Sequence, residues 1–242
     1  MSESRTSREA YQAWHRPLGV ELEPDAPWHR MIRARLEPGR DLAGRRVLEI
    51  GCGRGDFACW MARQPSRPQR VVAADFASVA VERGRRFAAE LGLENLAFTV
   101  ADIERLPFET ASFDTVVSCE TVEHVPSPPR ALLELARVLR PGGRLFLSTP
   151  NYFNVWAFYR GALRLAGRRF SEAGQPINQL MLAPRTLAWV RGAGLEVEAF
   201  DGVQHTFPTW PGRAALSLPA LERARPLTRW FGQQTLVVAR RP

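Results

Sequence analysis

Three glycines that follow a short apolar run give the chain a candidate ligand-binding turn. The run at residues 47–50 is typical of a central strand buried on both faces. Gly51, Gly53 and Gly55 follow it, and residues 56–63 suit a helix. Glycine adopts positive φ at little cost and lets a ligand approach bare backbone. The free N–H groups at the start of that helix favour an anionic or hydrogen-bond-accepting group at the same place.

An aspartate stands where a ribose-binding carboxylate is expected. Residues 71–74 resemble a second strand, and Asp75 ends it, 24 positions after Gly51. Doubly wound folds place such a carboxylate about 20 residues after the turn. The third glycine falls at Gly55, which gives Glu-x-Gly-x-Gly-x-Gly and not the dinucleotide pattern Gly-x-Gly-x-x-Gly. An NAD-dependent dehydrogenase therefore stays open as an alternative, but it is not the interpretation that this stretch favours.

Residues 119–125, Cys-Glu-Thr-Val-Glu-His-Val, carry the candidate acid–base chemistry. They follow a predicted strand at 113–118, and the carboxyl ends of parallel strands face the ligand crevice. A neutral His124 there can take a proton from a hydroxyl group, with Glu120 or Glu123 orienting the imidazole. In the alternative interpretation, His124 caps the next turn and contacts the substrate without exchanging protons.

The elements that position these residues alternate between strand and helix from residue 45 to 150, which favours a parallel sheet. Strands are predicted at 47–50, 71–74, 96–100, 113–118 and 144–148, helices at 56–63, 77–91 and 129–139, and a turn at 141–143. Residues 194–200 and 234–240 also alternate between apolar and polar in the manner of strands.

Five motifs, in order along the chain, resemble the class I S-adenosylmethionine (SAM)-dependent methyltransferases. The similarity is strongest to the ubiquinone-biosynthesis O-methyltransferase-like, methyltransferase type 11 group. The motifs are the glycine turn, Asp75, and residues 101–108, 112–114 and 139–143. The resemblance covers about residues 40–150. It implies an α/β fold: a Rossmann-like, doubly wound, seven-stranded sheet in three α/β/α layers, with strands 1–5 parallel and residues 234–240 as an antiparallel seventh strand.

The resemblance also implies SAM as the cofactor and S-adenosylhomocysteine (SAH) as the product. In the family, the position of Glu49 lies near the methionine end, Asp102 beside the adenine amine, and the Ile103 backbone faces the ring. The implied cofactor-binding residues are Glu49, Gly51, Cys52, Gly53, Asp75, Phe76, Asp102, Ile103 and Cys119. The predicted catalytic residues are His124, Glu120 and Glu123.

The pattern Glu-x-x-Glu-His also resembles small-RNA 2′-O-methyltransferases, where both carboxylates and the histidine bind a divalent metal completed by a second histidine. Here the corresponding later stretch, residues 175–179, contains no histidine, and His205 lies beyond it. No metal is predicted. The Asn/Asp-Pro-Pro-Tyr motif of amino-methylating enzymes is also missing after the fourth strand.

Composition bounds the function further. The 242 residues carry a net charge of +8, and all 33 basic residues are arginine. A basic chain invites a nucleic-acid or anionic-membrane partner, but arginines scattered over solvated helix faces explain the charge equally well. We expect a small-molecule or lipid-linked acceptor and no nucleic acid, with an RNA methyltransferase or a non-catalytic cofactor-binding module as alternatives. The three cysteines and the polar N-terminus indicate reduced thiols in a cytoplasmic protein.

One methyltransferase domain is predicted over residues 1–242: an N-terminal helical cap (1–44), the cofactor-binding core (45–150), an insertion or lid (151–190) and the C-terminal strands (191–242). Within the insertion, residues 152–170 place Arg160, Arg164 and Arg168 on one helix face. The opposite, apolar face comprises Phe153, Trp156, Tyr159, Leu163 and Ala166. This amphipathic pattern predicts either peripheral contact with an anionic membrane or a lid over the substrate pocket. The oligomeric state is left open.

Overall fold

The computed structural model describes residues 12, 25–167, 179–207, 216–217, 221, 224 and 228–242. The helices are α2 (Pro27–Arg35), η1 (Pro38–Leu42, a π-helix), α3 (Asp56–Ala62), α4 (Ser78–Glu90), η2 (Val122–His124), α5 (Pro128–Val138), α6 (Val155–Leu165) and α7 (Ala183–Gly192). The strands are β1 (Arg46–Ile50), β2 (Arg70–Asp75), β3 (Leu96–Val100), β4 (Phe113–Cys119), β5 (Leu139–Pro150), β6 (Glu196–Val203), β7 (Thr206–Phe207), β8 (Leu216–Ser217) and β9 (Gln234–Arg240).

Seven strands form one sheet in the order β3-β2-β1-β4-β5-β9-β6. Strands β1 to β5 pair in parallel, and β9 lies antiparallel between β5 and β6. The predicted fold class is therefore confirmed, including the antiparallel strand at residues 234–240. The strand order reverses between β1 and β4, and ligands of doubly wound sheets bind in the crevice at such a reversal. The small hairpin of β7 and β8 was not predicted.

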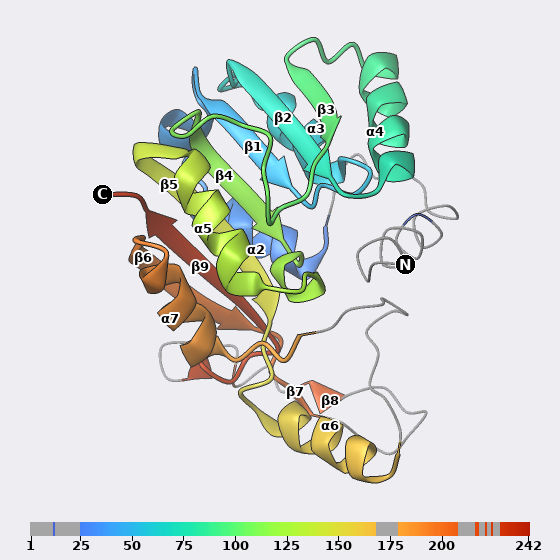
Figure 1. Ribbon diagram of the computed structural model, residues 1–242, viewed down its shortest axis with the longest axis vertical. Coiled ribbons are helices and arrows are strands. Elements are labelled where there is room, and N and C mark those ends of the chain that lie inside the picture. The colour runs from blue at the N-terminus through green and yellow to red at the C-terminus, as the bar shows by residue number, and fades with distance from the viewer. Residues whose placement is uncertain are drawn as a thin grey trace.

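Helices cover both faces of the sheet, which gives the three layers (Figure 1). On one face, α5 and α7 pack against the apolar side chains of Leu48, Ile50 and Leu145. On the other, α2, α3 and α4 pack against Val47 and its neighbours. Successive side chains of a strand point to opposite faces, so β1 contributes to both cores and is buried on both sides.

The turn predicted at residues 141–143 is wrong, because β5 continues through it from Leu139 to Pro150. The register between β4 and β5 shifts between Phe113 and Thr115, so the glycines form an irregularity inside the strand. Gly142 has φ of 77° and donates its N–H to the Arg241 carbonyl at 2.8 Å. A positive φ suits glycine in an interrupted ladder as well as in a turn.

The N-terminal segment packs on the sheet through α2. Ile32 is fully buried, and Met31 and Leu36 are nearly so. Gln12 caps the start of α4: its amide bonds the Ser78 hydroxyl at 2.8 Å and accepts the Val79 N–H at 3.0 Å.

The apolar face predicted for residues 152–170 is partly turned towards the cavity, as the lid alternative expects. Helix α6 turns Trp156 towards the interior, where it lines the main cavity, and Tyr159 packs edge-on against Trp156 at 5.6 Å. Phe153 stacks on Phe231 with ring centres 5.8 Å apart. The most exposed apolar side chains are instead Phe158, 82% exposed, and Leu165, 92% exposed. The protein therefore covers the face at Trp156 and Tyr159, whereas Phe153 stays 41% exposed.

The predicted basic face is not uniformly solvated either. The Arg160 guanidinium lies over the Tyr152 ring, 4.2 Å from its centre, whereas Arg164 is exposed and Arg168 lies outside the described residues. In Figure 1, α6 extends away from the sheet. Within the described part of the chain, no helix is both long enough and apolar enough to span a membrane.

Candidate cofactor and acceptor site

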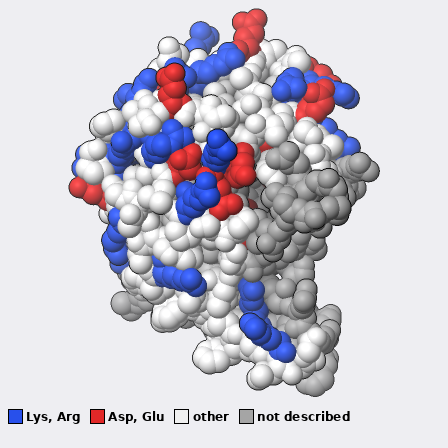
Figure 2. Space-filling model, viewed as in Figure 1, with Lys and Arg blue, Asp and Glu red and all other residues white. Residues whose placement is uncertain are grey.

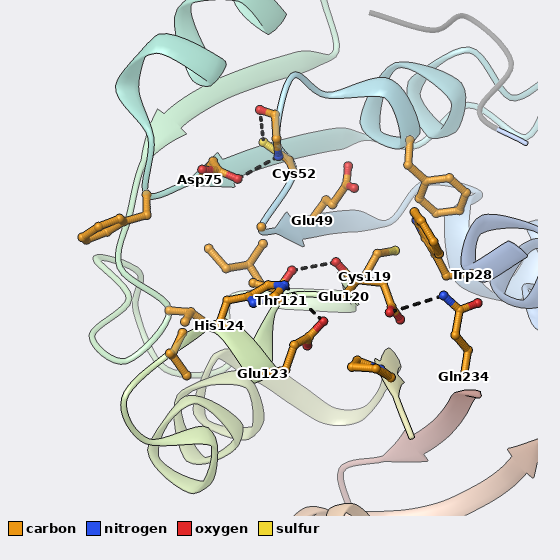
Figure 3. A pocket seen from close by; sticks show the side chains of 18 of the residues that line it. Trp28, Glu49, Cys52, Asp75, Cys119, Glu120, Thr121, Glu123, His124 and Gln234 are labelled. Carbon is orange, nitrogen blue, oxygen red and sulfur yellow. Dashed lines mark hydrogen bonds and ion pairs between the residues drawn. The ribbon is translucent and has the colours of Figure 1, made fainter. Parts of the chain in front are cut away.

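All twelve predicted site residues lie around one cavity of about 540 Å³ at the carboxyl ends of the parallel strands. The glycine turn after β1, the ends of β2 and β4, and the loop after β3 each contribute to its wall (Figure 3). The residues are Glu49, Gly51, Cys52, Gly53, Asp75, Phe76, Asp102, Ile103, Cys119, Glu120, Glu123 and His124. The topology thus brings together residues that are as far as 75 positions apart, between Glu49 and His124.

Two hydrogen bonds to Asp75 shape the glycine turn. The Asp75 carboxylate accepts the Gly53 N–H at 2.7 Å and the Ala77 N–H at 2.8 Å. Gly51 and Gly53 have φ of 75° and 53°, a region that favours glycine. A side chain at Gly51 would also collide with that of Thr121. The turn therefore needs glycine for conformation and for space, and Asp75 holds it beside the expected ribose position.

Glu49 contributes a carboxylate buried in the cavity wall. It is 2% exposed, and burial, followed by the negative charges of Asp56 and Asp75, raises its pKa well above the ordinary value. Its Oε2 atom has no hydrogen-bond partner within the described part of the chain. An unsatisfied buried carboxylate oxygen is costly, and a cationic or hydrogen-bond-donating ligand group would satisfy it. The ammonium and sulfonium groups of SAM are cations, so Glu49 fits the predicted cofactor.

The two cavity cysteines are unreactive wall residues. Cys52 and Cys119 are free and buried. Burial raises the pKa of both thiols well above the ordinary value, and nearby carboxylates, Asp75 for Cys52 and Glu49 for both, add to the effect. Thiolates are the reactive form of cysteine. These side chains therefore contribute shape and polarisable contact, and no nucleophile.

The loop after β3 forms the predicted adenine side of the cavity. Ile103 is 5% exposed, whereas Asp102 lies at the surface of the loop. The Asp102 carboxylate accepts the Glu104 N–H at 2.9 Å, and Glu104 in turn accepts the Ser127 N–H at 2.9 Å. These bonds fix the backbone of residues 102–104, against which a planar base could lie. The roles of Asp102 and Ile103 stay predictions.

Glu123 and His124 lie side by side in η2, directly after β4. Their carboxylate and Nε2 atoms are 3.5 Å apart, and their side chains are 2% and 10% exposed. The two side chains are thus close enough for Glu123 to act on the imidazole. The roles of His124 as a base and of Glu123 as the orienting carboxylate stay predictions.

Glu120 is anchored towards β5 and β9. Its carboxylate accepts hydrogen bonds from the Ser148 hydroxyl at 2.8 Å and the Gln234 amide at 3.4 Å. Its φ of 45° is rare for a residue other than glycine and costs about 1–3 kcal/mol of strain. In Figure 3, Glu120 points towards Gln234, while Glu123 and His124 occupy another part of the cavity. The orienting role predicted for either carboxylate thus fits Glu123 better.

No group of three histidine, cysteine or acidic side chains among the described residues is arranged to hold a metal ion. The sequence stretch that replaces the second histidine of the metal-dependent relatives, residues 175–179, lies almost entirely outside the described residues. The side chains that the structure places here thus offer no assembled divalent-metal site.

The predicted site residues do not include the wall formed by β5, β9 and the N-terminal segment, although the lid alternative for residues 152–170 placed Trp156 over the substrate pocket. These additional lining residues are Trp28, His29, Asn151, Tyr152, Trp156, Gln204, Gln233 and Gln234. We call the lining residues Asn151, Tyr152, Trp156, Gln204, Gln233 and Gln234 the acceptor side. The glycine turn follows β1, and these residues lie on the other side of β4 in the sheet order. One signal was available: an antiparallel strand begins at the edge where parallel strands end. That signal would have placed Gln233 and Gln234, at the start of the predicted strand 234–240, at this edge, but the prediction did not use it.

Negative charge dominates the cavity although the protein is basic. Among the described lining residues, Arg54 is the one arginine, and it pairs with Asp56 at 3.4 Å. The seven lining carboxylates are Glu49, Asp56, Asp75, Asp102, Glu104, Glu120 and Glu123. On the face seen in Figure 2, arginines are spread over the outer surface, several beside acidic residues. The site therefore favours cationic or neutral ligand groups over polyanions.

Known proteins share both the sequence motifs and the fold. Residues 48–147 match the family described as "Methyltransferase domain". The chain is 38% identical over 183 residues to a ubiquinone biosynthesis O-methyltransferase of Xanthomonas euvesicatoria pv. vesicatoria (strain 85-10), covering 73% of this chain and 72% of that relative. It is 34% identical to 27-O-demethylrifamycin SV methyltransferase of Amycolatopsis mediterranei (strain S699), covering 69% and 60%.

Solved structures agree on the fold. A SAM-dependent methyltransferase from Mesorhizobium loti superposes with a TM-score of 0.63 at 21% identity, covering 90% of this chain and 99% of that one. The [4+2]-cyclase SpnF superposes with a TM-score of 0.67 at 19% identity, covering 100% and 96%. Because a cyclase shares the fold, the architecture alone does not fix the reaction. The sequence relatives do, at 38% identity over 73% of this chain: the chain belongs to the class I SAM-dependent methyltransferases.

Proposed function

We propose that the protein methylates a hydroxyl group of a small, uncharged acceptor. The observation that carries the proposal is the charge of the cavity wall after β4, where the described lining residues include the carboxylates of Glu120 and Glu123 and no arginine. A phosphate-rich acceptor such as RNA would meet repulsion there. The acceptor side instead offers the amides of Gln233 and Gln234 and the aromatic rings of Tyr152 and Trp156. Amides recognise hydroxyl groups, and the rings provide apolar faces for a planar or aliphatic acceptor.

The chemistry asks little of the protein beyond positioning and one proton transfer. The chemistry that SAM would supply when bound is an electrophilic methyl group on a sulfonium sulfur, which the acceptor oxygen would take as the carbon–sulfur bond breaks. His124 accepts the proton that the acceptor hydroxyl loses, and Glu123 holds the imidazole and stabilises its cationic form. The aromatic acceptor side excludes water from the reacting oxygen.

Radiolabelled transfer tests the acceptor class. The protein is incubated with methyl-labelled SAM and, separately, an uncharged polyhydroxylated phenol, its phosphate monoester, and bulk tRNA. We expect label in the uncharged phenol alone, as an ether that survives alkali, because a methyl ester would hydrolyse. Label in tRNA, or preference for the phosphate ester, would contradict the proposal.

Substitution tests the acid–base roles. His124→Gln should lower kcat by about 10²–10⁴-fold and leave the Kd of SAH within about threefold, because the residue acts on the acceptor. Glu123→Gln should give a smaller loss and shift the pH profile of kcat. If His124→Gln keeps wild-type kcat, the histidine contacts substrate without exchanging protons.

We further infer that α6 brings the enzyme to a lipid surface, which would suit a lipid-linked acceptor. Phe158 and Leu165 are 82% and 92% exposed, and Arg164 is exposed on the same helix. Burying apolar area contributes about 25 cal/mol per Å², and an arginine at an anionic surface adds about 1 kcal/mol. Binding would be reversible, through the side chains that α6 turns outward, while Trp156 stays in the cavity wall.

Liposome flotation tests this surface. The double variant Phe158→Ser, Leu165→Ser should lose flotation with phosphatidylglycerol-containing vesicles, and Arg164→Gln should weaken it in proportion to the anionic lipid. Leu133→Ser is the matched control, because Leu133 is also an exposed apolar residue, 54% exposed, but lies on α5. If the wild-type protein does not float, or if the control loses flotation equally, α6 is a lid alone.

A further inference from the structure

Arg54, inside the glycine turn, carries hydrogen-bond donors that the protein leaves unused. Its Nη2 atom lies 3.4 Å from an Asp56 carboxylate oxygen. Its Nε and Nη1 atoms are buried and have no hydrogen-bond partner among the described residues. The side chain is 14% exposed, so water does not compensate fully. A guanidinium has five N–H donors and keeps its charge in proteins. Burying several of these donors without hydrogen-bond acceptors is costly.

The surroundings say which ligand group would satisfy this guanidinium. Arg54 is the one arginine among the described residues that line the cavity, and the acidic residues there outnumber it. The cofactor expected here carries two cationic groups, an ammonium and a sulfonium, and one carboxylate. Glu49, Asp56 and Asp75 line the same cavity, and their charges add to the burial that raises the pKa of the Cys52 thiol. These carboxylates favour the cationic groups, but they repel the cofactor's own carboxylate.

We infer that Arg54 binds the methionine carboxylate of SAM and SAH. The inference rests on the methyltransferase function above and assigns a residue to one charged end of the cofactor. Guanidinium and carboxylate make short, charge-assisted hydrogen bonds, often two in parallel. Because Nε and Nη1 are covered by protein atoms, the guanidinium must turn about its side-chain torsions to meet the ligand. The 3.4 Å contact with Asp56 is long for a hydrogen bond. Losing it when the guanidinium rotates therefore costs little free energy.

Calorimetric binding of two ligands isolates the contact. SAH and its decarboxylated analogue, 5′-deoxy-5′-(3-aminopropylthio)adenosine, differ only in the carboxylate. The wild-type protein should bind SAH about 10- to 100-fold more tightly than the analogue, the range expected of a hydrogen-bonded charge pair. In Arg54→Gln this preference should disappear, because SAH weakens while the analogue keeps its affinity. Arg54→Lys should retain part of it, since lysine keeps the charge and loses the planar fork.

Two further comparisons make the result decisive. Arg63→Gln removes an exposed arginine at the other end of α3 and should leave both affinities unchanged. The ligand pair also tests the wild-type protein directly, so the inference does not depend on the variant folding. Equal binding of both ligands by the wild type, or equal weakening of both in Arg54→Gln, would overturn the role of Arg54. Failure of the wild type to bind SAH at all would overturn the methyltransferase assignment itself.

Discussion

His29 presents an imidazole to the cavity that stays neutral at physiological pH. It stacks on Phe57 with ring centres 4.8 Å apart, and burial, together with the nearby Arg33 charge, lowers its pKa to about 4. In the unfolded chain the same group titrates near its ordinary value of 6.5. Between pH 6.5 and pH 4 the unfolded state therefore binds a proton that the folded state does not.

The sign of this difference gives a prediction. Acidification through that window should lower the free energy of unfolding by up to about 3 kcal/mol through His29 alone. His29→Phe keeps a ring against Phe57 and removes the titration, so its stability should fall less on acidification than that of the wild type. Urea unfolding at several pH values between 7.5 and 4.5, compared between the two proteins, measures the effect. Parallel pH dependence would show that another group governs it.

At the residue scale, sequence located one half of the cavity and not the other. Gly51, Asp75 and Glu123 stand at or shortly after the carboxyl ends of parallel strands, so motif and topology coincide. Tyr152 and Trp156 reach the same cavity only because the chain turns back at Asn151. That buried amide donates to the carbonyls of Trp230 and Gly232 and accepts the N–H groups of Phe153 and Ala183. These hydrogen bonds join segments about 80 residues apart. The sequence around Asn151 therefore shows no local pattern that would predict them.

The β1-turn-α3 element depends on two properties of glycine that can be separated. Gly51 has φ of 75°, and a Cβ there would collide with Thr121. Gly92 has a similar φ of 64°, with open space around it. Gly51→Ala should therefore distort the turn and abolish SAH binding. Gly92→Ala should cost about 1 kcal/mol or somewhat more of stability from backbone strain and keep the wild-type Kd.

Two measurements on both variants are needed: the Kd of SAH by calorimetry, and the free energy of unfolding in urea. Together they separate the effect of a positive φ from the effect of a Cβ that collides with Thr121. A wild-type Kd in Gly51→Ala would mean that the Thr121 side chain gives way without consequence. Loss of SAH binding in Gly92→Ala as well would show that general destabilisation, and not the cavity, is responsible.

Elements with a strong periodic pattern were predictable, and those shaped by partners were not. The strands at β1 to β4 and the helices α3, α4 and α5 lie within a few residues of their predicted bounds. At residues 141–143, backbone hydrogen bonds with Arg241 hold turn-forming residues within β5. In α6, the hydrophobic pattern correctly predicted a helix, but which face is covered depends on Tyr152, Trp156 and Phe231, and helical periodicity alone cannot decide that.

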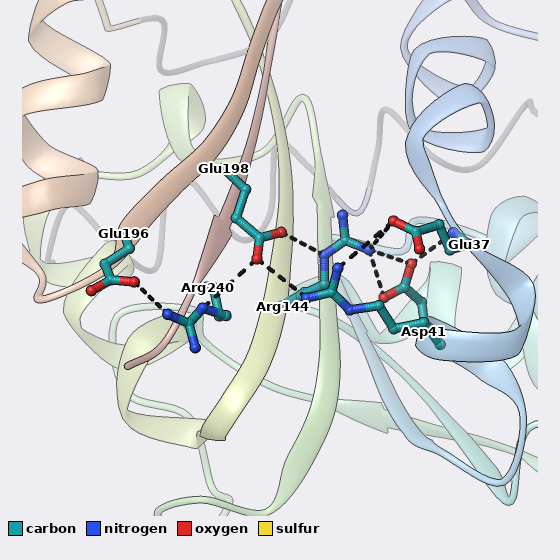
Figure 4. A network of polar contacts seen from close by, with 7 residues as sticks. Glu37, Asp41, Arg144, Glu196, Glu198 and Arg240 are labelled. Atoms are coloured by element: carbon teal, nitrogen blue, oxygen red, sulfur yellow. Dashed lines mark hydrogen bonds and ion pairs between the residues drawn. The ribbon is translucent and has the colours of Figure 1, made fainter.

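Across the whole molecule, a charge network ties the N-terminal segment to the sheet (Figure 4). Arg144 on β5 contacts Asp41 at 2.7 Å, Glu37 at 3.2 Å and Glu198 of β6 at 2.9 Å. Asp41 is 1% exposed, and burial raises its pKa although Arg144 and the Glu37 N–H oppose the shift. Desolvation therefore offsets much of the attraction, as is common for buried ion pairs. The network holds η1, and through it α2, in register with the strands.

Net charge was the least informative feature of the sequence at this scale. The value of +8 suggested a polyanionic partner, but it does not say where the charges lie. The folded chain uses arginines such as Arg144 in structural pairs, while carboxylates converge on the cavity. Only the tertiary arrangement shows that the site and the outer surface differ in sign.

Removing Arg144 should be far more costly than removing its neighbour Arg140. Arg144→Met leaves Asp41 buried without its guanidinium, which should lower the free energy of unfolding by about 3–5 kcal/mol. Arg140→Met is the matched control on the same strand: its pair with Asp114 is 3.0 Å long, but the Arg140 side chain is 41% exposed. An exposed pair contributes about 1 kcal/mol or less.

The double variant Asp41→Asn, Arg144→Met distinguishes the loss of the attraction between Asp41 and Arg144 from the cost of leaving a buried, unpaired Asp41 carboxylate. Because the amide carries no charge, the double variant should be more stable than Arg144→Met alone, and a double-mutant cycle in urea should show strong coupling. The single variant should also become more stable as the pH falls, since protonation neutralises Asp41. Additive losses, or equal costs for Arg144→Met and Arg140→Met, would mean that the N-terminal segment is held by the apolar contacts of Met31, Ile32 and Leu36 alone.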